Sequence, residues 1–247
     1  MENNLLISII TVSFNSAGTI AETIESVLNQ GYPFVEYTIV DGQSGDGTVA
    51  IARSYTDKFA EKGYRYEIIS ESDKGIYDAM NKGIARASGA IVGIINSDDY
   101  YMPGALEKVA AFYAETSFDI MYGDLRIFGN GKEYIKRAKH TKRFNTRFWN
   151  HPTTFVRREV YENNKYALDS IYDDLDFMLR ARRAGYKIRI LNETLANFRL
   201  GGVSNKRSLR KMLERVKIRN RIYKRNGCGF YRLNNFMIEA AKYILSK

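Results

Sequence analysis

The amino-acid sequence predicts an α/β fold with a mainly parallel central sheet. Short apolar runs rich in β-branched residues, such as residues 91–95, are typical of strands buried on both faces. These runs alternate with longer segments whose apolar residues recur at helical spacing. Because parallel neighbouring strands need a crossover connection, this alternation indicates right-handed βαβ units.

Length and composition are those of an ordinary globular protein. The 247 residues can bury a sizeable core in one large domain or two small ones. The single cysteine, Cys228, excludes an internal disulfide bond and fits a reducing compartment. No apolar run approaches the ~18 residues of a membrane-spanning helix, and residues 1–4 lack the basic start of a signal peptide. We therefore expect a cytoplasmic protein.

The predicted elements of the first half follow one another regularly. We expect strands over residues 5–14, 37–40, 66–70 and 91–95. Helices with apolar residues at helical spacing are expected over residues 20–28, 51–59, 77–84 and 103–113. Gly89 is the expected stop signal of the third helix. A half-domain of this kind is typical of nucleotide-binding proteins.

The second half of the chain changes rhythm. Asn130-Gly131 supplies the positive φ angles of a hairpin between strands over residues 120–128 and 133–136. We then expect a loop over 139–148, a strand over 153–156, a helix over 175–184 and strands near 187–190 and 195–198. Residues 1–204 therefore form one predicted domain, with a nucleotide half over 1–101 and an acceptor half over 102–204.

Carboxylates follow two of the predicted strands at one edge of the sheet, where open α/β sheets bind ligands. Asp98 and Asp99 repel each other unless a cation or hydrogen-bond donors offset their charge. Their oxygens suit Mg²⁺ or Mn²⁺, which in turn bind phosphate. Asp41 ends the second strand and could accept from a base or ribose. A helix cap after residue 96 and an Asx-turn at Asp41 are the structural alternatives.

Other candidate residues precede predicted helices. Asp73-Lys74-Gly75 leads into a helix whose N–H groups would favour a diphosphate, the alternative being a capped surface turn. Asp173-Asp174 precedes the helix over 175–184, where a carboxylate could serve as a general base or simply cap the helix. His151 could titrate near neutrality or donate to a substrate, although a histidine beside a proline is more often structural.

Taken together, these residues resemble the motifs of the inverting glycosyltransferases of family 2, which have the GT-A fold. The resemblance covers roughly residues 5–200, and several ordered motifs at compatible spacing are far more specific than any one of them. The matching segments are residues 9–15, 40–48, 73–83, 96–99 and 173–176, with Arg180 after the last.

The resemblance implies a role for each matching residue on the donor side. Thr11 and Asp41 would hold the base of a nucleotide, most often uridine. Asp73 and Lys74 would lie against the base and the diphosphate of a nucleotide-sugar. Other candidate substrate-binding residues in these motifs are Asn15, Gly75 and Asn81.

The same resemblance places Asp98 against the ribose and Asp99 on a divalent metal, Mg²⁺ or Mn²⁺. The family's motif often reads Asp-x-Asp or Asp-Asp-Asp, whereas Ser97 stands at the first position here. A single carboxylate would then carry most of the metal coordination.

On the acceptor side, the resemblance makes Asp174 the general base and lets Asp173 steer the acceptor or the sugar. The Gln-x-x-Arg-Trp motif of processive members is absent, and Trp149 is the only tryptophan. We therefore expect one sugar to be added per encounter. Many relatives act on lipid-diphosphate-linked saccharides in cell-surface polysaccharide synthesis, so the expected acceptor is a hydroxyl of such a saccharide. Further candidate acceptor contacts are Asp124, His151 and Arg180.

The basic charge is concentrated in a C-terminal extension, residues 205–247. Residues 206–225 hold ten Lys or Arg and one acid, Glu214, so nearly all of the net charge of +10 lies there. An apolar stripe on the same segment, Leu209, Met212, Leu213 and Val216, indicates an interfacial helix on the anionic inner face of the cell membrane. A nucleic-acid surface and a solvated helix packed on the body are the alternatives, and the lipid-linked substrates of its relatives favour the membrane over nucleic acid. A second amphipathic helix is predicted from Phe230.

Two other functional classes remain open. A nucleotidyltransferase that makes sugar nucleotides would also use paired aspartates and Mg²⁺, but it would carry a glycine-rich basic loop where residues 13–16 stand. A catalytically inactive module that binds sugar or nucleic acid would follow if Ser97 weakens the metal site.

Overall fold

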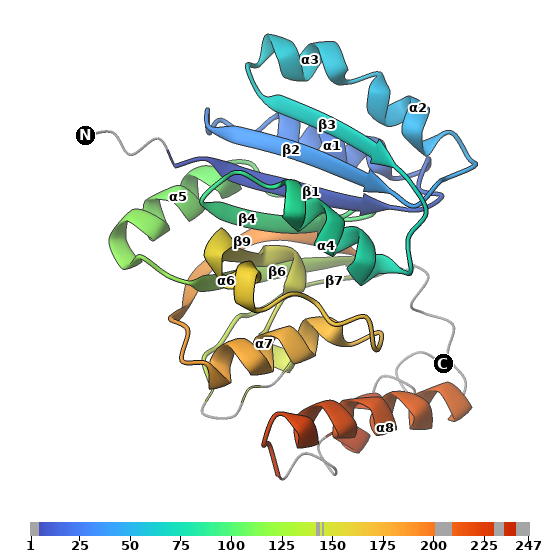
Figure 1. The fold of residues 1–247 in the computed structure, drawn as a ribbon, viewed down its shortest axis with the longest axis vertical. Coiled ribbons are helices and arrows are strands. Elements are labelled where there is room, and N and C mark those ends of the chain that lie inside the picture. The colour runs from blue at the N-terminus through green and yellow to red at the C-terminus, as the bar shows by residue number, and fades with distance from the viewer. Residues whose placement is uncertain (1–4, 142–143, 145, 201–208, 230–234, 241–247) are drawn as a thin grey trace.

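The computed structural model describes residues 5–141, 144, 146–200, 209–229 and 235–240. Within them the strands join into a single nine-stranded sheet, shown in Figure 1. Eight of the strands follow in the order β3 (Arg65–Ser70), β2 (Val35–Asp41), β1 (Ile7–Ser13), β4 (Ile91–Asn96), β8 (Thr154–Arg157), β6 (Ile120–Gly129), β9 (Ile188–Arg199) and β5 (Tyr100–Tyr101), and β7 (Lys132–Lys136) pairs with β6.

The first half of the sheet is parallel, as predicted. β1 pairs in parallel with both β2 and β4, and β2 pairs in parallel with β3. The crossover connections carry α1 (Ile20–Leu28), α2 (Thr48–Arg53) and α3 (Thr56–Glu61), and α4 (Ile76–Arg86). Every residue of β1 and β2 is buried, including polar residues such as Thr11 and Asp41, so both faces of these central strands are covered. The second half is mixed, because β8 runs antiparallel to both β4 and β6.

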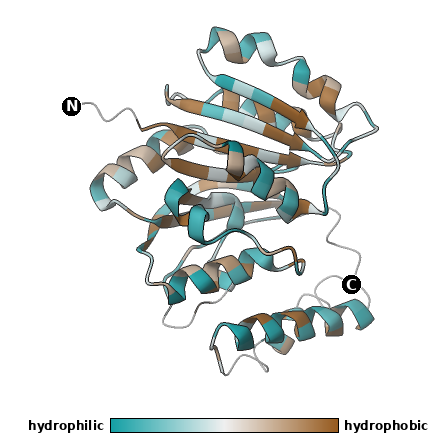
Figure 2. Cartoon of the chain, viewed as in Figure 1, coloured by the Kyte–Doolittle hydropathy of each residue, from teal (hydrophilic) through white to brown (hydrophobic). Residues whose placement is uncertain are grey.

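The sheet separates two hydrophobic cores, since successive side chains of a strand point to opposite faces. Ile9 of β1 packs in one core with α1, α3 and α5 (Ala105–Thr116). Ile10, the next residue, packs in the other with α4, α6 (Arg158–Asn163) and α7 (Asp173–Arg183). Figure 2 shows the apolar residues gathered along the central strands.

Several element boundaries differ from the prediction. The helix predicted over 51–59 is two short helices, α2 and α3, and the two strands predicted near 187–198 are one strand, β9. The pairing of β9 with β6 contains register shifts between Gly123 and Leu125, which interrupt the strand pattern in the sequence. α6 and β5 were not predicted.

Gly89 does not end α4, which stops at Arg86. A Cβ atom at position 89 would lie 2.6 Å from the carbonyl oxygen of Leu6. The glycine is therefore required by the close approach of the chain that enters β4 to the chain that enters β1.

The C-terminal extension begins, among the described residues, with α8 (Leu209–Arg225), and residues 235–240 are also helical. Met212 and Val216 of the predicted apolar stripe are buried, whereas Leu209 and Leu213 are exposed. Ile222 and Tyr223 of α8 belong to the same core as α7. Most of the predicted second helix, including Phe230, lies outside the described residues. None of the described helices is long and apolar enough to cross a membrane.

Candidate functional site

Two adjoining cavities lie at the carboxyl ends of β1 and β4. The β1 cavity has a volume of about 500 Å³. It is lined by residues 12–16, which are the end of β1 and the loop after it, by Asp73 and by residues 96–98 at the end of β4. The α7 cavity, of about 590 Å³, is lined by residues 74–78, by 168–171 and by the start of α7. The two cavities share Gly75, Ile76, Asn96 and Phe198.

The loop after β1 is fixed by the loop after β2. The backbone N–H of Asn15 donates to Ser44 Oγ at 2.8 Å, and Asn15 Oδ1 accepts from the N–H of Gly45 at 3.0 Å. Asn15 itself has a φ of 49°, a left-handed conformation that asparagine tolerates. Phe14, beside it, is 64% exposed and lines the β1 cavity. The predicted residue Asn15 therefore lines the cavity and also holds its loop.

Asp73 is held at the border between the two cavities. Its Oδ1 accepts from the N–H of Gly75 at 2.8 Å. A Cβ atom at position 42 would lie 2.5 Å from Asp73 Oδ2, so Gly42 lets the carboxylate approach the loop after β2. Gly75 has a φ of 118°, which other residues rarely adopt. Lys74, between them, lines the α7 cavity.

The two consecutive aspartates after β4 have different surroundings. Asp98 is half-buried and lines the β1 cavity, where burial raises the pKa of its carboxyl and the Arg199 cation opposes that rise. Asp99 is completely buried and lines neither cavity. Its Oδ1 accepts from the backbone N–H of Arg199 at 3.1 Å, and burial together with Asp98 raises its pKa well above the ordinary value.

Two oxygens near the shared border have the chemistry that a divalent cation requires. Asp98 supplies a carboxylate, and Asn96 Oδ1 is a buried acceptor without a partner among the described residues. Mg²⁺ and Mn²⁺ prefer such hard oxygen ligands and commonly complete their shells with phosphate and water. The described residues hold no cluster of three or more His, Cys, Asp or Glu suited to a metal. The residues present therefore fit a metal that a bound diphosphate helps to hold.

The first two residues of α7 bring carboxylates to the α7 cavity. Asp173 is completely buried, and its two oxygens accept from the N–H of Asp169 and from Ser170 Oγ, both at 2.9 Å. Burial raises the pKa of Asp173. Asp174 is half-buried, and its Oδ1 accepts from the N–H of Leu175 at 2.7 Å. Of the two, Asp174 is the carboxylate with access to a ligand.

Aromatic and imidazole groups surround Asp174. Tyr77 donates to the carbonyl oxygen of Ile171 at 3.2 Å. The pKa of the Tyr77 phenol is raised, mainly by burial and to a smaller extent by the nearby carboxylate of Asp174. His151 lines the same cavity, with Nε2 at 3.3 Å from the hydroxyl of Tyr166. Burial lowers the pKa of His151, and Asp174 opposes that change. Burial therefore disfavours the charged imidazolium of His151, which lines the same cavity as Asp174.

Two residues predicted to hold a nucleotide base lie outside both cavities. Thr11 is completely buried in β1, and its Oγ1 accepts from the hydroxyl of Tyr37 at 2.9 Å. Asp41 is also completely buried at the end of β2. Its carboxylate accepts from the hydroxyls of Ser13, Ser44 and Ser70. In the structure, both side chains are occupied in joining neighbouring strands.

Two further predicted residues hold the segment before α7 and line neither cavity. Asn81 of α4 pairs with the backbone of Tyr166, donating at 2.9 Å and accepting at 3.1 Å. Arg180 of α7 donates through Nε to Asp176 at 2.7 Å. Its other nitrogens donate to Asn164 Oδ1 and to the carbonyl oxygen of Lys165. These contacts give Asn81 and Arg180 a structural role in shaping the α7 cavity.

Asp124, a predicted acceptor contact, is completely buried at the bulged part of β6. It accepts from Arg137 Nη1 at 2.6 Å and from the N–H of Ala138 at 2.7 Å. Asp124 lines neither cavity. Its contacts hold the chain that leaves β7.

Several residues of the two cavities were not predicted from the sequence. Phe198 and Arg199 reach the β1 cavity from the end of β9, about 100 residues after Asp99 in the chain. Their place could not be predicted because it depends on strand pairing. Leu168 and Ile171 line the α7 cavity and are 51% and 58% exposed. Two aliphatic residues in the otherwise polar segment before Asp173 were a detectable sign.

Known proteins similar to this chain include two glycosyltransferases. The protein is 38% identical over 112 residues to the putative teichuronic acid biosynthesis glycosyltransferase TuaG of Bacillus subtilis, a match that covers 45% of this chain and 43% of TuaG. It is 27% identical over 226 residues to the PGL/p-HBAD biosynthesis glycosyltransferase of Mycobacterium bovis, which covers 88% of this chain and 86% of that protein. This chain thus spans less than half of TuaG.

Solved structures share the fold. S. aureus TarS 1-349, in complex with UDP, superposes with a TM-score of 0.69 at 21% identity, over 80% of this chain and 61% of that one. The mannosyltransferase PcManGT of Pyrobaculum calidifontis, in complex with GDP-Man and Mn²⁺, superposes with a TM-score of 0.68 at 16% identity, over 96% and 74%. The predicted GT-A fold is confirmed.

The model of the family described as glycosyl transferase family 2 matches residues 8–178, well over half of the chain. The matched segment contains the loops after β1 and β2, the aspartates after β4 and the start of α7. The protein belongs to glycosyltransferase family 2.

Proposed function

We propose that the protein transfers a single sugar from a nucleotide-sugar, with UDP as the nucleotide, to a hydroxyl group of a saccharide acceptor, with inversion at the anomeric carbon. The observation that carries this proposal is the pair of adjoining cavities, with Asp98 in one and Asp174 in the other. A donor in the β1 cavity and an acceptor in the α7 cavity would meet at the residues that both cavities share.

The donor occupies the nucleotide half, residues 1–101. The exposed ring of Phe14 offers a face on which the base can stack. Arg199 and Lys74 place positive charge on the two sides of the shared border, which suits a diphosphate. UDP is the first candidate because TarS is known in complex with UDP and with UDP-GlcNAc, and GDP is the second because PcManGT holds GDP-Man.

Asp98 and Asn96 would hold Mg²⁺ or Mn²⁺ as the ligands that line the β1 cavity. The expected ligand Asp99 is completely buried and lines neither cavity, and its Oδ2, like Asn96 Oδ1, has no partner among the described residues. The metal, when bound, offsets the charge that develops on the departing nucleoside diphosphate. Arg199 would add to this effect from the protein itself, since it lines the same cavity.

Asp174 acts as the general base of the acceptor half, residues 102–204. It takes the proton from the acceptor hydroxyl as that oxygen attacks the anomeric carbon. An acceptor in the α7 cavity, which adjoins the β1 cavity, would attack from the face opposite the leaving diphosphate. A single displacement of this kind converts an α-linked donor into a β-glycoside.

Calorimetric titration with UDP, GDP and CDP tests the donor and the metal together. We expect UDP to bind in the presence of Mn²⁺ and the affinity to fall sharply after EDTA is added. Binding of none of the three nucleotides would overturn the transferase proposal. Metal-dependent hydrolysis of a UDP-sugar without acceptor would separate an active enzyme from an inactive binding module. A second assay supplies UTP and a sugar phosphate, and failure to form a UDP-sugar from them would exclude the nucleotidyltransferase.

The acceptor is a saccharide carried on a lipid diphosphate, in the synthesis of a cell-surface polysaccharide. Support comes from three exposed aliphatic side chains of the α7 cavity, Ile76, Leu168 and Ile171, which suit an acceptor with an apolar portion. A transfer assay that compares free and lipid-diphosphate-linked forms of one saccharide tests this point. Equal kcat/KM values for the two forms would contradict it.

The enzyme works at the inner face of the cell membrane, to which α8 attaches it. Leu209 and Leu213 are exposed one helical turn apart on a helix that is otherwise rich in Lys and Arg. We expect the protein to sediment with anionic liposomes and to lose this property when the exposed residues Arg210, Lys217 and Lys224 are replaced by Gln. Equal sedimentation of both proteins would dismiss the membrane attachment.

A further inference from the structure

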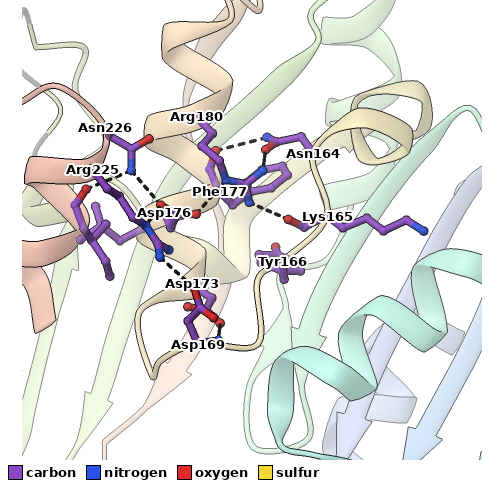
Figure 3. A network of polar contacts seen from close by, with 12 residues as sticks. Asn164, Lys165, Tyr166, Asp169, Asp173, Asp176, Phe177, Arg180, Arg225 and Asn226 are labelled. Atoms are coloured by element: carbon purple, nitrogen blue, oxygen red, sulfur yellow. Dashed lines mark hydrogen bonds and ion pairs between the residues drawn. The ribbon is translucent and has the colours of Figure 1, made fainter.

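The C-terminal helix α8 is joined to α7 by a network of polar contacts around a buried carboxylate, drawn in Figure 3. Asp176 of α7, whose side chain is 3% exposed, lies at its centre. Asp176 Oδ1 accepts from Arg225 Nε at 2.8 Å and from Asn226 Nδ2 at 2.7 Å, and Oδ2 accepts from Arg180. Charge-assisted hydrogen bonds to a buried carboxylate are strong and directional, so they fix the end of α8 on α7.

Arg225 extends the network to the segment that precedes α7. While its Nε holds Asp176, its Nη1 donates to Asp169 Oδ2 at 2.8 Å. One guanidinium therefore bridges the helix and the segment over residues 164–172, as Figure 3 shows. The planar group has donors in fixed directions, which suits two carboxylates at once.

Asp169 connects this bridge to the start of α7. The N–H of Asp169 and the hydroxyl of Ser170 both donate to the carboxylate of Asp173, the residue before the proposed base Asp174. Residues 168–171 also line the α7 cavity. Arg225 thus contacts Asp169, whose own N–H holds Asp173. Asp169 is also part of the wall against which an acceptor would lie.

The other contacts of residues 164–172 hold its first three residues and its last two, where Tyr77 donates to the carbonyl oxygen of Ile171 and Tyr172 donates to Glu239. Asn81 holds the backbone of Tyr166, and Arg180 holds Asn164 and Lys165. Among the described residues, Arg225 is the side chain from outside this segment and α7 that holds Asp169. Loss of Arg225 leaves Asp176 with two of its three donors, so the helix keeps its anchor while the side chain of Asp169 loses the contact that ties it to α8.

We propose that Arg225 is a positioning residue for the acceptor half of the reaction, fixing residues 168–171 and the start of α7 so that Asp174 meets the acceptor hydroxyl. The inference rests on the proposed transferase function. The basic C-terminal extension is then part of the acceptor site, in addition to any contact with a membrane.

Kinetics of Arg225→Met test this role, with Arg183→Met as the matched control. Arg183 is an exposed arginine near the end of α7 and outside the network. The probe is hydrolysis of UDP-glucose or UDP-GlcNAc, in which water takes the place of the acceptor, and UDP affinity is measured in parallel. We expect Arg225→Met to lower kcat by ~10-fold or more, because small misplacements of a base are costly, with UDP affinity unchanged. Arg183→Met should behave as wild type.

Two further variants separate positioning from general stability. Arg225→Lys should recover part of the kcat that Arg225→Met loses. A lysine keeps the positive charge, but its ammonium cannot bridge the two carboxylates as well as a guanidinium does. Asp169→Asn should lose kcat in the same direction with Asp176 still paired, and the double variant with Arg225→Met should lose no more than Arg225→Met alone. Fully additive losses, or equal kcat for Arg225→Met and Arg183→Met, would overturn the proposal.

Hydrogen exchange gives a readout that needs no substrate. Backbone amides of residues 168–172 should exchange faster in Arg225→Met than in Arg183→Met, and those of residues 13–16 should not change. Unchanged exchange at 168–172 would overturn the role of Arg225 even in an active enzyme. A wild-type protein that binds no nucleotide would instead overturn the transferase function, while the exchange experiment still decides whether Arg225 fixes this segment.

Discussion

Asp98 and Asp99 are consecutive in the chain, yet Asp98 lines the β1 cavity while Asp99 is completely buried and accepts from the backbone N–H of Arg199 at 3.1 Å. The turn after β4 sends the two side chains in different directions. Asp99 thereby joins the end of β4 to the end of β9, and Asp98 is left facing the space for a ligand.

Replacement of each aspartate by asparagine separates these roles. We expect Asp98→Asn to lose the Mn²⁺-dependent part of UDP binding, by ~10-fold or more, because a carboxylate ligand becomes a neutral amide. Asp99→Asn should keep UDP affinity close to that of wild type, since its remaining oxygen can still accept from Arg199. Calorimetry with Mn²⁺ and with EDTA measures both. The reverse pattern would return the metal to Asp99.

Asp174→Asn removes the proposed base with almost no change in shape. We expect kcat to fall by ~10²-fold or more while UDP affinity is kept, because an amide cannot take the acceptor proton. Steady-state turnover of a UDP-sugar together with UDP titration checks this outcome. Asp57→Asn, at an exposed position of α3, is the control. Normal turnover of Asp174→Asn would remove Asp174 from the role.

Phe14→Ala tests whether the exposed ring in the β1 cavity stacks on the nucleotide base. Loss of one base–aromatic stack weakens binding by about 1–3 kcal/mol, so UDP affinity should fall clearly. The melting temperature should stay close to wild type, because the ring is 64% exposed. Phe34→Ala, just before β2 and outside both cavities, should leave UDP affinity unchanged. Equal affinities of the two variants would argue against stacking.

Glu36→Gln should destabilise the protein in a pH-dependent way. Burial alone would raise the pKa of Glu36, but hydrogen bonds from Ser8, Ser88 and Gly89 outweigh it and lower the pKa below its ordinary value of 4.5. A lowered pKa in the folded state means that the ionised group stabilises the fold above pH 4.5 and that this contribution is lost as the pH falls.

Urea unfolding at pH 7 and below pH 4.5 measures this effect. We expect Glu36→Gln to lower the free energy of unfolding by about 1–3 kcal/mol at pH 7 and by less at the acidic pH. Glu61→Gln, at an exposed position at the end of α3, is the control. A difference that grows as the pH falls would contradict the sign of the pKa shift.

Much of the fold could be predicted because its main elements are coded locally. β1, β2 and β4 are buried on both faces, and each is made mostly of β-branched residues. β9 could not be predicted as one strand, because the bulged pairing with β6 is a contact between distant segments. The same reason explains why Phe198 and Arg199 were missed at the β1 cavity.

The candidate site was predicted in part. Asn15, Asp73, Lys74, Gly75, Asp98, His151, Asp173 and Asp174 line the two cavities. Thr11, Asp41, Asn81, Asp99, Asp124 and Arg180 line neither, and their side chains make contacts that hold the walls. A motif identifies which residue types gather at a site, but it does not say which of them face the ligand.

The sequence by itself determined the alternation of strands and helices and the carboxylates that follow the strands, because hydrophobic periodicity and turn residues act over a few neighbours. The tertiary structure alone decided which aspartate faces a cavity and which is buried. It also decided that Arg225, 56 residues after Asp169, would lie against it. Such contacts depend on how whole elements pack, and the packing is fixed only when both faces of the sheet are covered.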